Sequence, residues 1–113
     1  MKKIQKIRAV CFQHQQGRCH YCGFPMWQED MPRFARDMGI TPNQARMLQA
    51  TAEHLVPRSE GGKDHATNVV AACHTCNTRR HKRKVPRTPA AHRAWILTRL
   101  AAGAWHCLPL SKA

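Results

Sequence analysis

The sequence predicts a small α+β domain in which a two-stranded hairpin lies between N- and C-terminal helices and a four-cysteine zinc site holds them together. Two observations predict this fold class. Two Cys-x-x-Cys pairs lie far apart in the 113-residue chain, and short apolar groups at strand and helix spacing surround them. A chain of this length is expected to form one domain, residues 1–113, whose modest core would benefit from a bound metal.

Four of the six cysteines form the two pairs, and a pair of this spacing turns two thiolates toward one tetrahedral ion. One pair alone also fits a redox motif, whereas two pairs in a basic chain predict a structural zinc site. We expect the remaining two, Cys11 and Cys107, to be small buried hydrophobic residues. The predicted zinc ligands are Cys19, Cys22, Cys73 and Cys76.

The distribution of charge predicts a polyanionic partner. The formal net charge is +13, and all six acidic residues lie between Glu29 and Asp64. The first 18 residues and segment 78–93 are rich in Lys and Arg and contain no acid. Nucleic acid is favoured over an anionic membrane surface, because neither basic flank carries a strong Trp/Phe/Leu face.

Membrane insertion and secretion are not expected from the hydropathy pattern. A membrane span needs roughly 18 consecutive apolar residues, and no segment approaches that. The N-terminal sequence MKKIQKIRAV lacks the apolar core of a signal peptide. We therefore expect a cytoplasmic protein with no membrane partner.

A basic helix is predicted over residues 3–17. Apolar residues recur at helical spacing from Ile4 to Cys11, and Gly17 ends the pattern. The first cysteine pair follows at once, and Gly23 suits the left-handed backbone position that such metal-binding turns need.

Segment 24–51 is predicted to be an insertion containing one or two helices. Pro25 and Pro32 are expected to interrupt it. Thr41 and Pro42 predict an N-cap followed by proline at the first helical position, and this helix is expected to continue to about Gln49. We assign no chemistry to this segment.

The following stretch is predicted to form a β-hairpin with a long loop. Residues 51–56 have the length and pattern of a short strand closed by Pro57. Gly61 and Gly62 predict a turn, and residues 68–72 predict the second strand.

Two further helices are predicted after the hairpin. From about His74 the pattern becomes helical and strongly basic, and it stops before Pro86. A last helix is predicted over residues 88–102, with Thr88 as its cap and Gly103 after its end.

The hairpin and the helix after it concentrate residues suited to phosphodiester hydrolysis, which requires an activated water and neutralisation of phosphoryl charge. His54 is a natural general base near neutral pH. On a regular strand, Glu53 and His54 point to opposite faces. Either a bulge re-aims them, or Glu53 binds a metal while His54 acts on water, and Asn77 offers a neutral oxygen to a hard ion such as Mg2+ or Mn2+.

In their order along residues 19–83, these motifs resemble the HNH nuclease motif of the zinc-ribbon type. The resemblance implies a ββα-metal domain that hydrolyses DNA and leaves 5'-phosphate and 3'-hydroxyl ends. The residues that carry the resemblance are Glu53, His54, Pro57, Gly61, Gly62, Asn68, Cys73, Cys76, Asn77 and Arg80.

The resemblance also implies a role for each residue of the site. Glu53 and Asn77 would bind one catalytic divalent ion, and His54 would be the general base. Asn68 would tie the hairpin loop together and orient that base, and Arg80 would hold the scissile phosphate.

The last motif position departs from histidine, because Asn77 occupies it, and this favours Mg2+ or Mn2+ over transition ions. His81 would share the helix face of Asn77 and is an alternative ligand. A run of Lys and Arg on and beyond the same helix is expected to bind the phosphates of double-stranded DNA, whatever its sequence. These residues are Arg79, Lys82, Arg83 and Lys84.

The competing interpretation is a non-catalytic zinc-ribbon module that binds nucleic acid. A pure binding module has no need for Glu53, His54 and Asn77 together, and all three are present.

Overall fold

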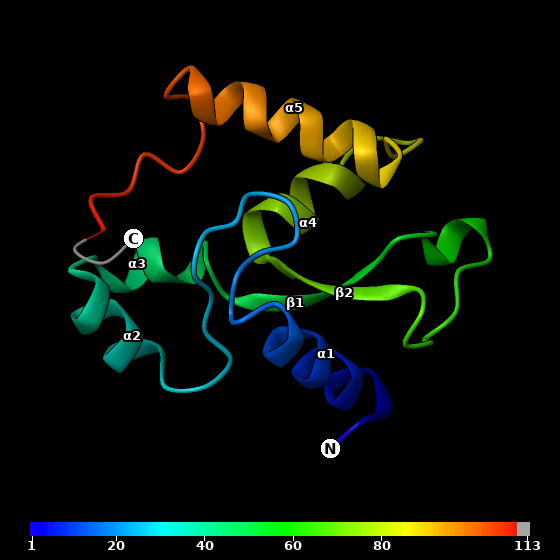
Figure 1. Ribbon diagram of the computed structural model, residues 1–113, viewed down its shortest axis with the longest axis horizontal. Coiled ribbons are helices and arrows are strands. Elements are labelled where there is room, and N and C mark those ends of the chain that lie inside the picture. Colours follow the sequence, from blue (N-terminus) through cyan, green and yellow to red (C-terminus); the bar gives the residue numbers. More distant parts are fainter. Residues whose placement is uncertain (111–113) are drawn as a thin grey trace.

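The computed structural model describes residues 1–110, and a two-stranded antiparallel hairpin lies at its centre (Figure 1). Ala52 pairs with Ala71 in the middle of the hairpin, and Ala50 pairs with Cys73 at one end. The elements in chain order are α1 (Lys3–His14), α2 (Met31–Met38), α3 (Pro42–Arg46), β1 (Ala50–His54), the 3-10 helix η1 (Arg58–Glu60), β2 (Val69–Cys73), α4 (His74–His81) and α5 (Pro89–Ala101).

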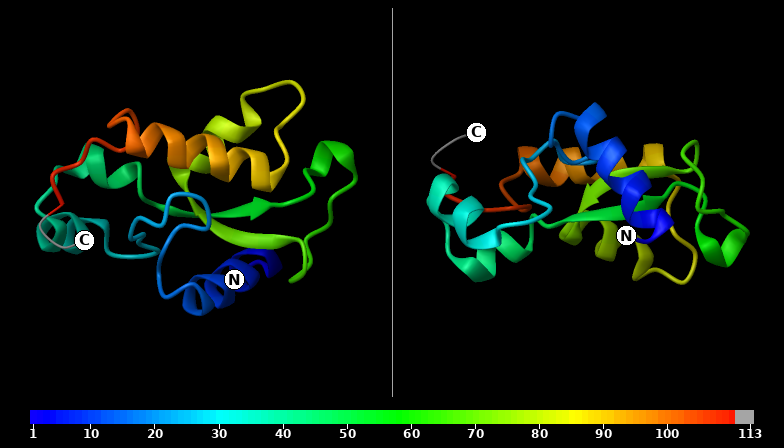
Figure 2. Two further views of the ribbon diagram at one scale, coloured as in Figure 1. Left: turned by 45° about the horizontal axis from the view of Figure 1, so that its top comes forward. Right: turned by 90° about the horizontal axis from the view of Figure 1, so that it is seen from below.

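Helices cover both faces of the hairpin. α1 packs against one face, α4 packs against the other, and α5 lies beyond α4 (Figures 1 and 2). α2 and α3 pack together at the end of the hairpin away from η1. This arrangement confirms the predicted α+β class with flanking N- and C-terminal helices.

α1 ends three residues earlier than predicted, at His14. Gln16 and Gly17 take left-handed backbone conformations, with φ of 55° and 71°. These two residues reverse the chain into the first cysteine pair, and Gly23 follows that pair with φ of 75°, as predicted.

The inserted segment contains two helices, and Pro32 does not interrupt it. Pro32 lies in the first turn of α2, where the missing N–H is not needed. Thr41 caps α3 as predicted by accepting a hydrogen bond from the Gln44 N–H. α3 ends at Arg46 instead of Gln49, because residues 48–50 exchange backbone hydrogen bonds with Trp27.

β1 starts one residue earlier than predicted and ends at His54 instead of residue 56. The backbone of Leu55 and Val56 is held by Asn68, which accepts from the Leu55 N–H through its carbonyl and from the Val56 N–H through its side chain. Gly62 then passes so close to Val56 that a Cβ on it would lie 1.7 Å from the Val56 carbonyl oxygen. Only glycine fits at position 62 of this loop.

The core contains few large aliphatic side chains. Leu48 and Ile96 are fully buried, and cysteines, alanines and aromatic residues supply most of the rest. Cys11 is half-buried, and its thiol donates to the Val69 carbonyl. Cys107 is exposed, so the prediction that it is buried is wrong. No helix within residues 1–110 has the length and apolar character of a membrane span.

Candidate active site

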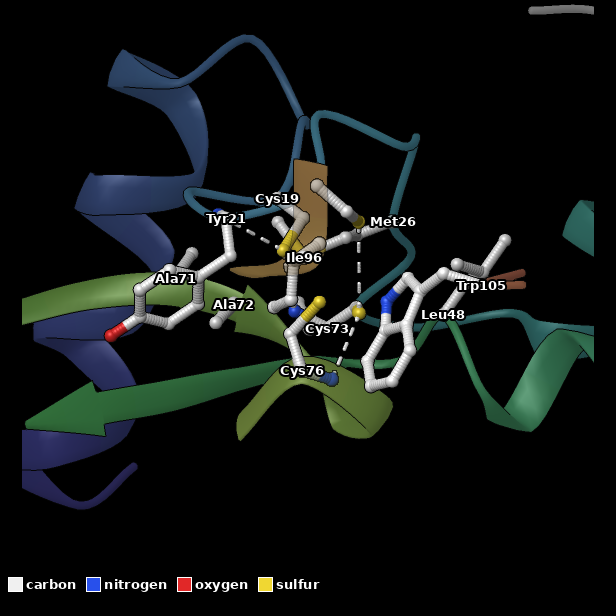
Figure 3. Close-up of a cluster of buried hydrophobic side chains, with 12 residues drawn as sticks. Cys19, Tyr21, Met26, Leu48, Ala71, Ala72, Cys73, Cys76, Ile96 and Trp105 are labelled. Atoms are coloured by element: carbon white, nitrogen blue, oxygen red, sulfur yellow. Dashed lines mark hydrogen bonds between the residues drawn. The ribbon is translucent and has the colours of Figure 1, made fainter. Parts of the chain in front are cut away.

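The four predicted zinc ligands form one buried cluster. Their sulfur atoms all lie within 4.8 Å of one another, and the Cys22 and Cys73 sulfurs are 4.0 Å apart. Zn–S bonds of about 2.3 Å in a tetrahedron place sulfurs about 3.8 Å apart, so the cluster fits a zinc ion with little adjustment. Figure 3 shows the cysteines at the junction of the first pair, β2 and α4, surrounded by Leu48, Ile96 and Trp105.

Polar groups around the cluster suit thiolates. The backbone N–H groups of Tyr21 and Cys73 donate to the Cys19 sulfur at 3.4 and 3.3 Å. His106 Nε2 lies 3.4 Å from the Cys73 sulfur. These donors stabilise negative charge on sulfur, as expected around a four-cysteine zinc ion.

A pocket of about 390 Å³ lies where β1 ends beside α4 and η1. It brings together the predicted metal ligands, the predicted base and the alternative ligand. Its lining is formed by Ile4, Ala52, Glu53, His54, Pro57, Arg58, Ser59, Asn77 and His81.

The Glu53 carboxylate lies at the base of this pocket, 1% exposed. Its Oε2 accepts from the Tyr21 hydroxyl at 2.9 Å and from the Arg80 guanidinium at 3.0 Å. Its Oε1 lies 2.7 Å from His81 Nε2. Burial raises the pKa of Tyr21, so its hydroxyl stays protonated and remains a donor. Glu53 is therefore held rigidly through Oε2, and only Oε1 is available to an ion.

Arg80 does not lie where the resemblance implied. Its side chain is 2% exposed. Besides Glu53, its guanidinium donates to the backbone carbonyls of His54, Leu55 and Arg87 at 2.8–2.9 Å. These bonds and its burial fix the guanidinium inside the protein, so Arg80 positions Glu53 and the end of β1 and does not face the solvent, where a phosphate would bind.

Asn77 and His81 face the pocket from successive turns of α4. The Asn77 amide nitrogen donates to Thr51 Oγ1 and to the Ala52 carbonyl, at 3.0 and 3.2 Å. This anchoring leaves its Oδ1 without a partner among residues 1–110. The 2.7 Å between Glu53 Oε1 and His81 Nε2 is close to the roughly 3 Å that separates neighbouring ligands of an octahedral ion. The three side chains thus fit an oxygen-preferring divalent ion, and they leave coordination positions open.

His54 lies on the rim of the pocket with two partners in the hairpin loop. Its Nε2 lies 2.7 Å from Asp64 Oδ1 and 3.3 Å from Arg58 Nε. Arg58 in turn donates to both oxygens of Asp64, at 3.0 and 3.2 Å. β1 ends at His54, so Glu53 and His54 both reach the pocket although they are neighbours on one strand.

Asn68 ties the hairpin loop together. Its side-chain oxygen accepts from the Val56 N–H at 2.8 Å, and its amide nitrogen donates to the carbonyls of Val56 and Lys63. None of these hydrogen bonds within residues 1–110 goes to His54. The loop that it closes is the one that carries Arg58 and Asp64.

The sequence analysis did not find three residues of this site: Tyr21, Arg58 and Asp64. Tyr21 lies inside the first cysteine pair, and the other two flank the Gly-Gly turn. In the sequence, only their position within the motif indicated a role in the site. The residues that they contact are far away in sequence or lie across a loop whose shape the sequence does not define. By contrast, the proposed phosphate-binding residues are all exposed; these are Arg79, Lys82, Arg83 and Lys84.

Comparison with known proteins agrees with this geometry. A family model described as HNH endonuclease matches residues 19–83, more than half of the chain. No curated protein and no solved structure matches. The matched region begins at Cys19 and ends just beyond α4, so it contains the cysteine cluster and every lining residue of the pocket except Ile4. The chain therefore belongs to the HNH endonuclease family.

Proposed function

We propose that this chain is a metal-dependent endonuclease that hydrolyses the phosphodiester bonds of double-stranded DNA. The observation that carries the proposal is that Glu53, His54, Asn77 and His81 all line one open pocket. A carboxylate, an amide oxygen and two imidazoles in one solvent-accessible pocket supply the groups that the reaction needs.

In this proposal Glu53 and Asn77 hold one Mg2+ or Mn2+ ion through oxygens, and His81 is a third donor. The bound ion supplies charge stabilisation for the phosphoryl group and the departing 3' oxygen. His54 accepts the proton of the attacking water. Arg80 and Tyr21 keep the Glu53 carboxylate in place, and Thr51 with Ala52 does the same for the Asn77 amide.

The zinc held by the four cysteines has a structural role in this proposal. Four thiolates leave no position for water or substrate, which is typical of structural zinc. Cys76 is a zinc ligand and Asn77 is a proposed ligand of the catalytic ion, so the zinc fixes the start of α4 and with it the second site. Exposed Lys and Arg at the end of α4 would hold the DNA backbone by charge, so binding is expected to weaken steeply with added salt.

The test is nicking of supercoiled plasmid by zinc-loaded protein with Mg2+ or Mn2+. We expect nicking by the wild type and a rate about 10²- to 10⁴-fold lower for His54→Ala, because a general base contributes about that much. A His65→Ala variant is the matched control, since His65 is an exposed histidine of the hairpin loop whose hydrogen bonds within residues 1–110 go to Thr67 and Asn68 and not to His54. Absence of nicking with either ion, or equal nicking by His54→Ala, contradicts the proposal.

One observation favours the competing function, a non-catalytic zinc-ribbon module that binds nucleic acid. The Glu53 carboxylate already has three partners within 3.0 Å, which is also how a purely structural acid is satisfied. That function predicts DNA binding that is independent of Mg2+ and no cleavage. Gel-shift and nicking assays on one preparation separate the two.

A further inference from the structure

Asp64 makes the shortest side-chain contact to the proposed base. Its carboxylate lies in the loop between η1 and β2, outside the set of residues that the motif singles out. Oδ1 is 2.7 Å from His54 Nε2, and both oxygens accept from Arg58. One carboxylate therefore bonds a histidine and an arginine that both line the pocket.

The distance between Asp64 and His54 identifies which ring nitrogen carries the proton. At 2.7 Å, an unprotonated Nε2 would place its lone pair against a carboxylate, so Nε2 must be the donor. Arg58 Nε lies 3.3 Å from His54 Nε2, which is a longer contact than the one between His54 and Asp64. The guanidinium makes its shorter contact, at 3.0 Å, with Asp64. His54 Nδ1 has no partner within residues 1–110. Its lone pair is available to a water.

Arg58 is the exposed arginine that lines this pocket. Arg80, which was expected to meet the phosphate, is 2% exposed and bonded to Glu53 and to three backbone carbonyls, whereas the Arg58 side chain is 63% exposed. The two Asp64 contacts leave the other terminal nitrogen of Arg58 without a partner within the described residues. A phosphate in the pocket would meet this guanidinium before any other.

We propose that Asp64 is a positioning residue that fixes His54 with Nδ1 toward the water and holds Arg58 where it binds the scissile phosphate. The inference rests on the proposed function, since it gives His54 the role of base. It replaces Arg80 by Arg58 as the phosphate ligand. Asp64 itself touches neither water nor phosphate.

A double-mutant cycle on plasmid nicking tests the first half. We expect Asp64→Ala to lower kcat on the order of 100-fold in the wild-type background, because the base loses its orientation. In a His54→Ala background the same change should lower kcat less than about threefold, since residues acting as a unit are strongly non-additive. An equal loss in both backgrounds would mean a general structural role and overturn the proposal.

Folding is controlled in the same experiment. Asp64→Asn keeps an acceptor oxygen and should recover part of the loss seen in Asp64→Ala. Glu60→Ala, which removes an exposed acid of η1 outside the pocket, should leave kcat unchanged. All variants are compared by thermal melting, and an Asp64→Asn variant that is as impaired as Asp64→Ala while remaining folded counts against the hydrogen-bond geometry.

The second half of the proposal, that Arg58 binds the scissile phosphate, is tested by measuring KM for DNA. Arg58→Gln should raise KM for DNA about tenfold, and Arg58→Lys should raise it much less because it keeps the charge. Arg83→Gln, which removes an exposed charge outside the pocket, is the comparison for a general loss of positive charge. If Arg58→Gln and Arg83→Gln behave alike, Arg58 is not the phosphate ligand.

A readout without cleavage separates this proposal from the function itself. In zinc-loaded protein with 15N-labelled histidine and no added magnesium, the His54 ring should show its proton on Nε2 and should lose its protection from exchange in Asp64→Ala. A proton on Nδ1 in the wild type overturns the proposal. If the wild type fails to nick DNA while the Nε2 proton is found, the proposed function fails and the hold of Asp64 on His54 stands.

Discussion

The cysteine cluster and the pocket are built on the same elements but differ in exposure. The four cysteines are buried, and their sulfurs supply all four ligands of a tetrahedral zinc ion. The pocket is open, and of its lining residues Glu53 and Pro57 are buried while the others are partly or fully exposed. Cys76 and Asn77 are consecutive residues of α4, yet Cys76 belongs to the cysteine cluster and Asn77 lines the pocket. A closed ligand set supports structure, and an open one supports exchange of water and substrate.

The two regions are also physically joined. Tyr21 lies between the cysteines of the first pair, and its hydroxyl donates to Glu53 in the pocket. His92 of α5 packs edge-on against the Tyr21 ring and lies 2.9 Å from the Cys76 carbonyl through Nε2. Loss of the cluster should therefore disable the pocket, whereas damage confined to the pocket should leave the cluster intact.

The largest effect is expected from Cys73→Ser. Structural zinc in small domains contributes about 10–16 kcal/mol of apparent binding free energy, which is at least as large as the stability of a typical domain, about 5–15 kcal/mol. The variant should lose zinc and its cooperative unfolding transition, measured by metal analysis and circular dichroism. Cys107→Ser, at an exposed cysteine, is the matched control and should melt like the wild type. A zinc-free, folded Cys73→Ser protein would contradict the zinc assignment.

Arg80→Gln should have the second largest effect. It leaves the buried Glu53 carboxylate without its ion pair, and breaking a buried pair costs about 3–5 kcal/mol. Urea unfolding should show this loss, while zinc content stays at one ion per chain. The control Arg83→Gln removes an exposed arginine and should stay within about 0.5 kcal/mol of the wild type. Equal stability of the two variants would show that Arg80 is not structural.

Tyr21→Phe tests the link between the regions. It removes one hydrogen bond to a buried carboxylate, worth about 1.5–3 kcal/mol. Zinc binding should be unchanged because the cysteines are untouched, but nicking should slow because Glu53 is held less firmly. A variant that loses zinc as readily as Cys73→Ser would show that Tyr21 belongs to the cluster alone.

The smallest effect is expected from Thr88→Ala at the start of α5. The Thr88 hydroxyl accepts from the Ala91 N–H, and loss of such a cap costs about 1 kcal/mol. The melting temperature should fall by about 4–8 °C for a domain of this size. Because α5 does not line the pocket, the nicking rate below the transition should not change. Thr98→Ala, in the interior of the same helix, is the control and should be close to neutral.

Local signals in the sequence were sufficient for most of the fold. The caps at Thr41 and Thr88 and the hairpin strands depend on neighbouring residues, and the structure has them at or within a few positions of the predicted places. The boundaries shifted where a distant residue competed for the backbone. Asn68 ended β1 early, and Trp27 ended α3 early, since hydrogen bonds to remote partners leave no trace in local spacing.

In the candidate site, too, the sequence predicted what depends on residue type and order, and it did not predict what depends on contacts between remote residues. Residue type and motif order identified Glu53, His54 and Asn77, and two cysteine pairs predicted one buried cluster. The sequence did not show that Arg80 is buried against Glu53, because an arginine one turn after Asn77 looks alike whether it faces solvent or a buried carboxylate. It also missed Asp64 and Tyr21, whose importance comes only from the atoms that face them.

By itself, the sequence determined which chemistry the chain contains: four thiolates in two pairs, a carboxylate beside a histidine, an amide on the following helix, and a strong excess of positive charge. Only the tertiary structure decided how those groups are divided, with Arg80 bonded to Glu53 inside the protein and Arg58 paired with Asp64 at the exposed edge of the pocket. The physical reason is that covalent order and spacing specify local geometry. Burial and the choice of hydrogen-bond partner depend on segments that meet only when the hairpin, the cysteine pairs and α4 pack together.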